Sequence, residues 1–257
     1  MSLQGEFGRV AQEGGRAALV TVVRPGDGAQ LGAKLLVRAD GAGSGTLGSP
    51  ELDQAAHADA EELMWAERSE LREHGEVTIF VDVVAPSPRL VIFGAVDFAA
   101  ALCRVARATG WRPYVVDPRG RFATAERFPE AEEVISAWPA EALARLGGID
   151  RATYLTVLTH DPKLDDAALI AALDSEAPFV GAMGSRRAQA QRRERLLAAG
   201  VAEEKLERVS APIGLDLGGL TAEETALSIM AEIVAVRNGR DGGRLSQAGG
   251  RIHEVGT

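Results

Sequence analysis

A short string of small and basic residues, Gly184-Ser185-Arg186-Arg187, could bind a phosphate group. It follows the apolar pair Phe179-Val180 and leads into a segment that carries further arginines. Small residues let the backbone approach a ligand, amides at a helix start face outward, and guanidinium groups donate paired hydrogen bonds. We expect only Arg186 and Arg187 to lie near enough to the turn to contact a phosphate. The alternative is a solvated helix face whose arginines pair with Glu194.

A second polar string, Thr159-His160-Asp161, follows the apolar residues 154–158. Ligands of open α/β sheets bind beyond the carboxyl ends of the strands, so these side chains are placed for polar contacts. An imidazole titrates near neutrality and could transfer protons, but no serine or cysteine nucleophile is linked to it by spacing. The alternative, that Asp161-Pro162 only ends the strand and Asp165 caps the next helix, stays open at this point.

A third string, Gly94-Ala95-Val96-Asp97, stands where dinucleotide-binding proteins carry G-x-G-x-x-G/A between a strand and a helix. Val96 replaces the middle glycine, which lets the backbone approach a pyrophosphate, and Asp97 adds negative charge at the helix start. Asp117 follows the next predicted strand, where an acid could bind a ribose hydroxyl. The pattern favours a turn that packs for structural reasons, with dinucleotide binding as the alternative.

The composition limits the kinds of partner. The chain has 257 residues, 46% apolar and 25% charged, which is typical of globular proteins. A formal net charge of −9 argues against nucleic acid or an anionic membrane as the main partner. One cysteine, Cys103, and four scattered histidines give no spacing typical of a metal site. No signal-peptide pattern and no apolar stretch of about 18 residues occurs, so we expect a cytoplasmic protein.

The first part of the chain predicts a small α/β domain over residues 1–86. The apolar runs 17–23 and 35–37, separated by turn residues, indicate paired strands. Apolar residues at spacings of three and four after Pro50 predict a helix that ends near Gly75, and residues 77–83 resemble a strand. Pro86-Ser87-Pro88 cannot continue a ladder or a helix, so we place a domain boundary there.

The rest of the chain predicts a Rossmann-like domain over residues 87–240, followed by a flexible tail over 241–257. Strand and helix patterns alternate as in a parallel sheet, and the uninterrupted apolar strands indicate burial on both faces. Thr221 and Glu224 form a capping-box pattern at the start of the last helix. The predicted strands are 90–93, 114–116, 134–135, 154–158 and 179–180, and the predicted helices are 98–109, 139–146, 165–173, 185–199 and 221–237. The fold class is therefore α/β, with a Rossmann-like parallel sheet and a smaller α/β N-terminal domain.

Five strings of this second domain form one ordered set. They are Leu90-Val91-Ile92-Phe93-Gly94-Ala95, Val115-Val116-Asp117-Pro118-Arg119, Leu158-Thr159-His160-Asp161-Pro162-Lys163, Val180-Gly181-Ala182-Met183-Gly184-Ser185-Arg186 and Pro212-Ile213-Gly214-Leu215-Asp216-Leu217-Gly218. Together they resemble the xanthine dehydrogenase accessory factor family, which includes maturation factors for carbon monoxide dehydrogenase. Residues 32–37 and 45–48 resemble the first domain of that family more weakly.

The resemblance implies a non-catalytic assistant for molybdenum hydroxylases. Such a protein binds the molybdenum cofactor (molybdopterin), protects it while a cysteine desulfurase supplies its terminal sulfur, and delivers it to the apo-enzyme. It also favours a homodimer. The candidate cofactor-binding residues are Gly94, Ala95, Asp117, Arg119, Thr159, His160, Asp161, Gly184, Ser185, Arg186, Arg187, Gly214 and Asp216.

The chain departs from the family pattern at two places. Many members carry Ser-Gly-Gly-Cys-Val-Glu in the first domain, where this chain has Gly48-Ser49-Pro50-Glu51-Leu52-Asp53 and therefore no thiolate for molybdenum. Val96 and Asp97 replace the usual glycine and histidine of the Rossmann turn. Two alternatives stay open: an NAD(P)-dependent oxidoreductase, and a degenerate member that only docks to a dehydrogenase. Cys103, next to apolar residues, is expected to be a packing thiol rather than a sulfur-transfer residue.

Overall fold

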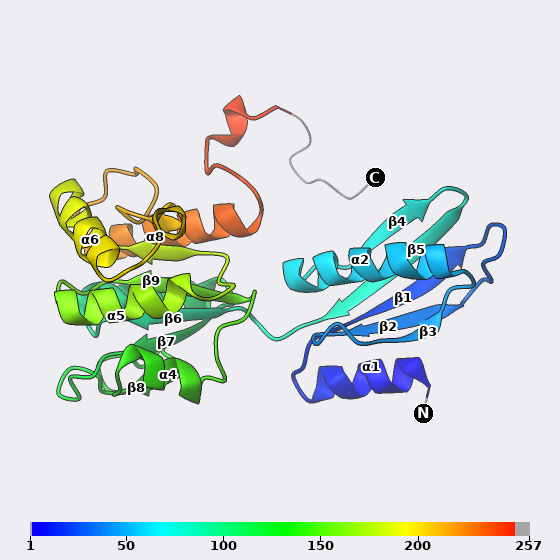
Figure 1. Ribbon diagram of the computed structural model, residues 1–257, viewed down its shortest axis with the longest axis horizontal. Helices are drawn as coiled ribbons and strands as arrows, with labels where there is room; N and C mark the ends of the chain where they lie inside the picture. Colours follow the sequence, from blue (N-terminus) through cyan, green and yellow to red (C-terminus); the bar gives the residue numbers. More distant parts are fainter. Residues whose placement is uncertain (1, 250–257) are drawn as a thin grey trace. The chain divides into compact units, whose positions relative to one another are not determined.

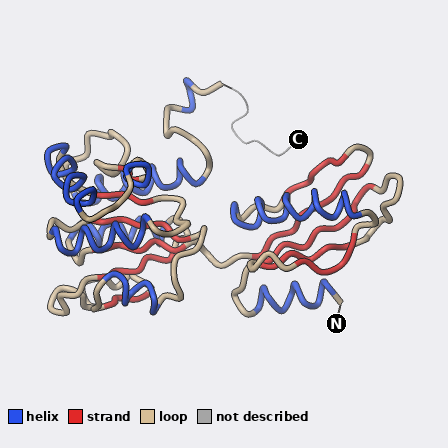
Figure 2. Tube along the Cα trace, viewed as in Figure 1, coloured by secondary structure: helices blue, strands red, loops and turns tan. Residues whose placement is uncertain are grey.

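The computed structural model describes residues 2–249, which form two compact units. The first unit comprises residues 2–86, with residues 244–249 grouped with it, and the second comprises residues 87–243. In each unit the strands form one layer that is flanked by helices (Figure 2). Of the tail predicted over 241–257, residues 250–257 lie outside the described residues, and Leu245–Gln247 forms a short 3-10 turn.

The first unit is a five-stranded antiparallel sheet with the order β3-β2-β1-β5-β4. Helix α1 (Leu3–Gln12) and helix α2 (Pro50–Ala66) cover opposite faces of this sheet (Figure 1). Phe7 of α1 packs on one face against Leu19 and Leu36, whereas Ala60 and Leu63 of α2 belong to the core of the other face. The strands are β1 (Ala17–Arg24), β2 (Lys34–Arg38), β3 (Gly43–Thr46), β4 (Glu70–His74) and β5 (Val77–Val84).

The helix predicted to end near Gly75 ends at Ala66, well before that glycine, and this prediction was wrong. Glu67 takes a left-handed conformation with φ 56° and reverses the chain. The following residues form β4, which pairs antiparallel with β5. The sequence of β4 is polar at almost every position, so no apolar alternation marked it as a strand. Helix α1 was not predicted either.

The second unit is a six-stranded parallel sheet with the order β11-β10-β9-β6-β7-β8, which confirms the predicted α/β fold class. Its strands are β6 (Arg89–Phe93), β7 (Arg112–Val116), β8 (Glu133–Ile135), β9 (Thr153–Val157), β10 (Val180–Ala182) and β11 (Val209–Ser210). Its helices are α3 (Asp97–Ala108), α4 (Pro139–Arg145), α5 (Pro162–Leu173), α6 (Arg186–Ala198), α7 (Glu203–Leu206) and α8 (Ala222–Arg237). The short elements β11 and α7 were not predicted.

Both faces of the parallel sheet are buried, as the apolar strands indicated. Alternate strand residues such as Val91 and Leu155 pack in the core beneath α4, α5 and α6. Their neighbours Ile92 and Tyr154 pack in the core beneath α3 and α8. Because side chains alternate between faces along a strand, each strand contributes to both cores. This double burial fixes the strand ends that carry the candidate residues.

The sheet topology defines where a ligand can bind. Strand β6 is central, and the chain first adds β7 and β8 on one side and then β9, β10 and β11 on the other. The crevice of such a sheet opens beyond the carboxyl ends of the strands at this change of direction. Among residues 2–249, no helix has the length and apolar character that crossing a bilayer requires.

Candidate functional site

The candidate site lies beyond the carboxyl ends of β6 and β9, which are neighbours in the sheet. Gly94, directly after β6, has φ +111°, a conformation that side chains rarely adopt. A Cβ atom on Gly94 would lie 3.0 Å from the amide nitrogen of Thr159 and 3.1 Å from its Cβ. Glycine is therefore required here because the two strand ends approach each other closely.

Asp117, directly after β7, is 0% exposed and joins two turns. Its Oδ2 accepts hydrogen bonds from the Ala95 amide at 2.9 Å and from Arg119 Nη2 at 2.8 Å. Its Oδ1 accepts from the Arg119 amide and from Arg119 Nε, both at 2.9 Å. A carboxylate has about four acceptor positions, and all are filled. Asp117 therefore positions Ala95 and Arg119, and leaves no acceptor for the ribose hydroxyl of the dinucleotide alternative.

The pKa of Asp117 reflects the same contacts. Burial alone would raise the pKa of this carboxyl, but the hydrogen bonds from Arg119 and from the Ala95 amide outweigh burial, and the pKa is lowered. The hydrogen bond to Asp117 in turn raises the pKa of Arg119, and the charge of Asp161 adds to this rise. Asp161 belongs to the turn after β9, so the electrostatic network connects the ends of β7 and β9.

The turn after β6 does not fit a dinucleotide diphosphate. Val96 is the N-cap of α3 and makes no side-chain capping hydrogen bond, and Asp97 begins the helix. Arg127 Nη1 donates to the Ala95 carbonyl at 3.0 Å, and its Nη2 donates to Asp97 Oδ1 at 3.1 Å. A diphosphate at this helix start would meet the Val96 side chain and the Asp97 carboxylate in place of the glycine and free amides it requires.

The turn after β9 is partly structural. Thr159 is buried, and its Oγ1 accepts a hydrogen bond from the Asp161 amide at 2.9 Å. Asp161 Oδ1 accepts from the Lys163 amide at 3.0 Å and so caps α5, which begins with Pro162. The alternative in which Asp165 caps this helix is wrong. His160 is exposed at the tip of the turn.

The turn after β10 carries the phosphate candidates. Gly184 has φ +134°, and Ser185 caps α6, its Oγ accepting from the Ala188 amide at 3.2 Å. Arg186 and Arg187 are exposed at the first two helical positions, and they make no ion pair with any residue in 2–249. Two free guanidinium groups at the start of a 13-residue helix suit an anion.

The other arginines of α6 are paired, but not with Glu194 as the alternative expected. Their partners are carboxylates of α5 and α7: Arg192 with Asp165, Arg193 with Glu203, and Arg195 with Asp166. The Asp165 and Arg192 side chains are 4% and 6% exposed, and sequence reasoning did not assign either of them to the site. One available signal was the spacing of four between Arg192 and the apolar Leu196, which places Arg192 on the inner face of the helix.

Two backbone hydrogen bonds connect the β10 turn with its neighbours. The Met183 amide donates to the Val157 carbonyl at 2.8 Å, and the Ile213 amide donates to the Ala182 carbonyl at 3.1 Å. Gly214 packs on α8, where its amide donates to Glu232 Oε2 at 2.6 Å. The segment 212–219 is thus held at β10 and at α8, and Asp216 is exposed on it.

The structure thus joins some of the predicted residues by direct contacts. Gly94, Ala95, Asp117, Arg119, Thr159 and Asp161 form one network at the ends of β6, β7 and β9. The turn of Gly184, Ser185, Arg186 and Arg187 follows β10, which pairs with β9. Gly214 packs against α8 rather than against these turns. The roles of all these residues in ligand binding stay predictions.

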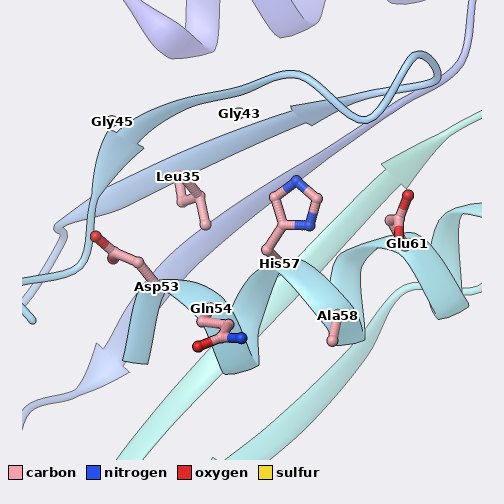
Figure 3. Close-up of a pocket in the computed structure, with 8 residues that line it drawn as sticks. All are labelled: Leu35, Gly43, Gly45, Asp53, Gln54, His57, Ala58 and Glu61. Atoms are coloured by element: carbon pink, nitrogen blue, oxygen red, sulfur yellow. The ribbon is translucent and has the colours of Figure 1, made fainter. Parts of the chain in front are cut away.

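The first unit has a separate hollow of about 490 Å³ between α2 and strands β2 and β3 (Figure 3). Asp53, His57 and Glu61 line it at spacings of four along α2, opposite Gly43. His57 Nε2 lies 2.9 Å from the Gly41 carbonyl, so in the neutral ring Nδ1 is the free acceptor. The hollow therefore presents acceptor groups. Sequence reasoning missed it, although the four-residue spacing was visible.

Metal-binding and sulfur chemistry have little support among the described residues. Within residues 2–249, no three histidine, cysteine or acidic side chains lie close enough together to hold a metal ion. Cys103 is 0% exposed in the core beneath α3 and α8. Burial raises the pKa of its thiol to about 12, so almost no thiolate forms at neutral pH.

Comparison with known families matches both units. Residues 90–233 match the family described as XdhC Rossmann domain, and residues 10–75 match the XdhC and CoxI family. The first match covers the parallel sheet from β6 to β11 and most of α8.

Three curated proteins are similar to this chain. The uncharacterized protein YqeB of Escherichia coli is 28% identical over 227 residues, which cover 82% of this chain and 41% of YqeB. A protein of Bacillus subtilis named as a probable xanthine dehydrogenase component is 30% identical over 159 residues, covering 62% of this chain and 46% of that protein. The molybdenum cofactor insertion chaperone PaoD of Escherichia coli is 26% identical over 268 residues, covering 86% of this chain and 83% of PaoD.

The chain spans less than half the length of YqeB and of the Bacillus subtilis protein. Among solved structures, a crystal structure described as a xanthine dehydrogenase from Bacillus halodurans matches with a TM-score of 0.64. The two chains are 23% identical, and the match covers 91% of this chain and 66% of the other. At this identity, the likeness shows a shared fold.

Proposed function

The chain belongs to the XdhC family, and from this membership we propose that it is a maturation factor that binds the molybdenum cofactor and delivers it to a molybdenum hydroxylase. The strings at the strand ends predicted this family. A relative of similar length, PaoD, is named a molybdenum cofactor insertion chaperone, and the Bacillus subtilis relative is named as part of a probable xanthine dehydrogenase. These names support a client of the xanthine dehydrogenase type.

The observation that carries the proposal is the pair of free arginines after β10. Arg186 and Arg187 are exposed at the start of α6, whereas the three following arginines of this helix are neutralised by carboxylates. The molybdenum cofactor is a pterin that carries a phosphate. We assign the phosphate to the Arg186 guanidinium, the Ser185 hydroxyl and the first amides of α6, which are all donors.

The polar ring of the pterin is assigned to the neighbouring turns. His160 and Asp216 are exposed, and Asp161 is half-buried between Arg119 and the start of α5. Gly94 and Asp117 do not contact the ligand in this proposal; they hold the turns in place. The proposal contains no covalent step, because no activated nucleophile accompanies these residues. It places sulfuration of the cofactor with a cysteine desulfurase and includes a homodimer in the cytoplasm.

The first test is equilibrium binding of the purified full chain to the metal-free pterin phosphate, with NADH and NADPH as competitors. We expect saturable binding that neither nicotinamide displaces. Arg186→Ala removes one charge-assisted contact of about 1.5–3 kcal/mol and should weaken binding at least about tenfold. Arg193→Ala, on the same helix but paired with Glu203, is the matched control and should bind like the wild type.

Other outcomes contradict the proposal. Nicotinamide binding without pterin binding would favour the oxidoreductase alternative. Capture of an apo molybdenum hydroxylase without any pterin binding would favour a protein that only docks. A second assay measures delivery: the loaded chain is mixed with the apo-enzyme, and the gain of hydroxylase activity is compared with that from the Arg186→Ala variant.

A further inference from the structure

A buried ion pair reaches from α5 and α6 to the turn after β10. Arg192 Nη2 donates to Asp165 Oδ2 at 2.8 Å and also to the Met183 carbonyl at 3.0 Å. Arg192 Nη1 donates to Gln189 Oε1. Gln189 Nε2 then donates to the carbonyls of Ala182 and Gly184, both at 3.2 Å. One network thus holds three consecutive carbonyl groups, those of residues 182, 183 and 184.

This arrangement is an expensive way to connect two helices. Asp165 and Arg192 are more than nine-tenths buried, and Asp165 Oδ1 and Arg192 Nε have no hydrogen-bond partner among the described residues. Desolvation of both charges offsets most of their attraction, so a buried pair of this kind adds little stability compared with apolar residues of the same volume. A specific geometric role accounts for the pair better than stability does.

The neighbouring pair shows the contrast. Arg195 and Asp166 also connect α6 with α5, through contacts of 2.7 and 2.9 Å, but both side chains are partly exposed and neither contacts the β10 turn. Two helices could therefore be joined without a buried charge. What only Arg192 provides is a charged donor on the Met183 carbonyl, next to the strained Gly184.

We propose that Asp165, Arg192 and Gln189 are positioning residues, which set the turn at residues 183–185 so that Ser185 and Arg186 face the ligand crevice. Arg192 itself binds no phosphate, because two of its nitrogens are occupied and its side chain is buried. The inference rests on the proposed function for its ligand, but the geometry of the turn can be measured without any ligand.

The first experiment is hydrogen exchange, followed by mass spectrometry, on the full chain without ligand. Gln189→Met removes both contacts to Ala182 and Gly184 while leaving the ion pair, and Arg192→Lys keeps the charge but cannot make all three contacts. We expect exchange in residues 183–188 to become at least about tenfold faster in both variants. Exchange in the remainder of α5 and α6 should stay as in the wild type, because a local loosening leaves the helices packed.

The second experiment measures binding of the metal-free pterin phosphate, with the urea midpoint as a check on stability. The double variant Asp165→Leu/Arg192→Met replaces the buried pair by apolar groups, and its matched control is Asp166→Leu/Arg195→Met. We expect the first to lose at least about tenfold in affinity with its urea midpoint retained, and the control to keep both. If the first double variant does not fold, Gln189→Met and Arg192→Lys give the same comparison.

The outcomes separate the two claims. If the wild type does not bind the pterin phosphate, the proposed function fails, while the exchange result still decides the inference. Wild-type exchange at residues 183–188 in both single variants would overturn the inference. It would also be overturned by variants that lose affinity only in proportion to a lowered urea midpoint, because that result indicates a purely structural role.

Discussion

Replacement of Asp117 by asparagine should destabilise the parallel-sheet unit strongly, and the same change at Asp97 should not. Both aspartates lie at the carboxyl edge of the sheet and both pair with an arginine. Asp117 is 0% exposed and accepts four hydrogen bonds, whereas the Asp97 side chain is 92% exposed and accepts one from Arg127. The two substitutions therefore make the same chemical change in two different environments.

The magnitude follows from the donors around the carboxylate. Asparagine keeps one oxygen and turns an amide group toward two of the four donors from Ala95 and Arg119. Each hydrogen bond to a charged group contributes about 1.5–3 kcal/mol. Because Arg119 is partly exposed and can turn toward water, we take the lower end, about 3 kcal/mol in total. At Asp97 the loss should be at most about 1 kcal/mol, the usual range for exposed pairs and helix-terminal charges.

The assay is urea unfolding of the full chain, fitted with separate transitions for the two units. With a slope of about 2 kcal/mol per molar urea, a loss of 3 kcal/mol lowers the midpoint of the second unit by about 1.5 M. The first unit should unfold as in the wild type. A shift below about 0.5 M for Asp117→Asn, or equal shifts for the two variants, would refute the argument that four filled acceptor positions define this edge.

Acid should reduce the same difference. The pKa of Asp117 is lowered from its ordinary value of 3.8, so its stabilising contribution is present above that pH and is lost as the pH falls through the folded-state value. The gap between wild type and Asp117→Asn should therefore narrow below pH 3.8. A gap that widens on acidification would contradict the assigned charge state.

Three further predictions concern single positions. Gly94→Ala should cost about 2 kcal/mol in urea unfolding, because it combines a positive φ with a Cβ 3.0 Å from the Thr159 amide. Gly43→Ala, where φ is not positive and the nearest atom belongs to His57 at 3.4 Å, should change stability by less than about 0.5 kcal/mol. Cys103, with a pKa of about 12 and no exposed surface, should not react with a thiol reagent at pH 8 until urea unfolds the chain; labelling of the native protein would contradict its burial.

The sequence predicted the parallel sheet well because each of its longer strands is an apolar run. Residues 90–93 and 154–158 have few polar neighbours, and burial on both faces requires this composition. Strand β4 could not be found in this way, because its polar residues pair with β5 at the sheet edge. What defines β4 is its partner strand and the left-handed Glu67 before it, and neither has an apolar pattern.

The site was predicted by position, but not by role. Strand ends indicated Asp117 and Asp161 correctly as residues at the crevice edge, yet a carboxylate that binds a ligand and one that binds its own backbone look identical in sequence. The same holds for α6, where five arginines are near neighbours. Only the phase of the helix, set by Leu196, directs Arg192 inward and leaves Arg186 outward.

The network around Asp117 also bears on how fast a ligand can come and go. The turns after β6, β7 and β9 are fastened to one another by groups of the protein itself, so they are already ordered before a ligand arrives. An ordered surface loses little conformational entropy on binding, and its association needs no slow rearrangement. Loading and release at these turns should therefore follow single-exponential kinetics, which suits a surface from which a cargo is handed on rather than retained.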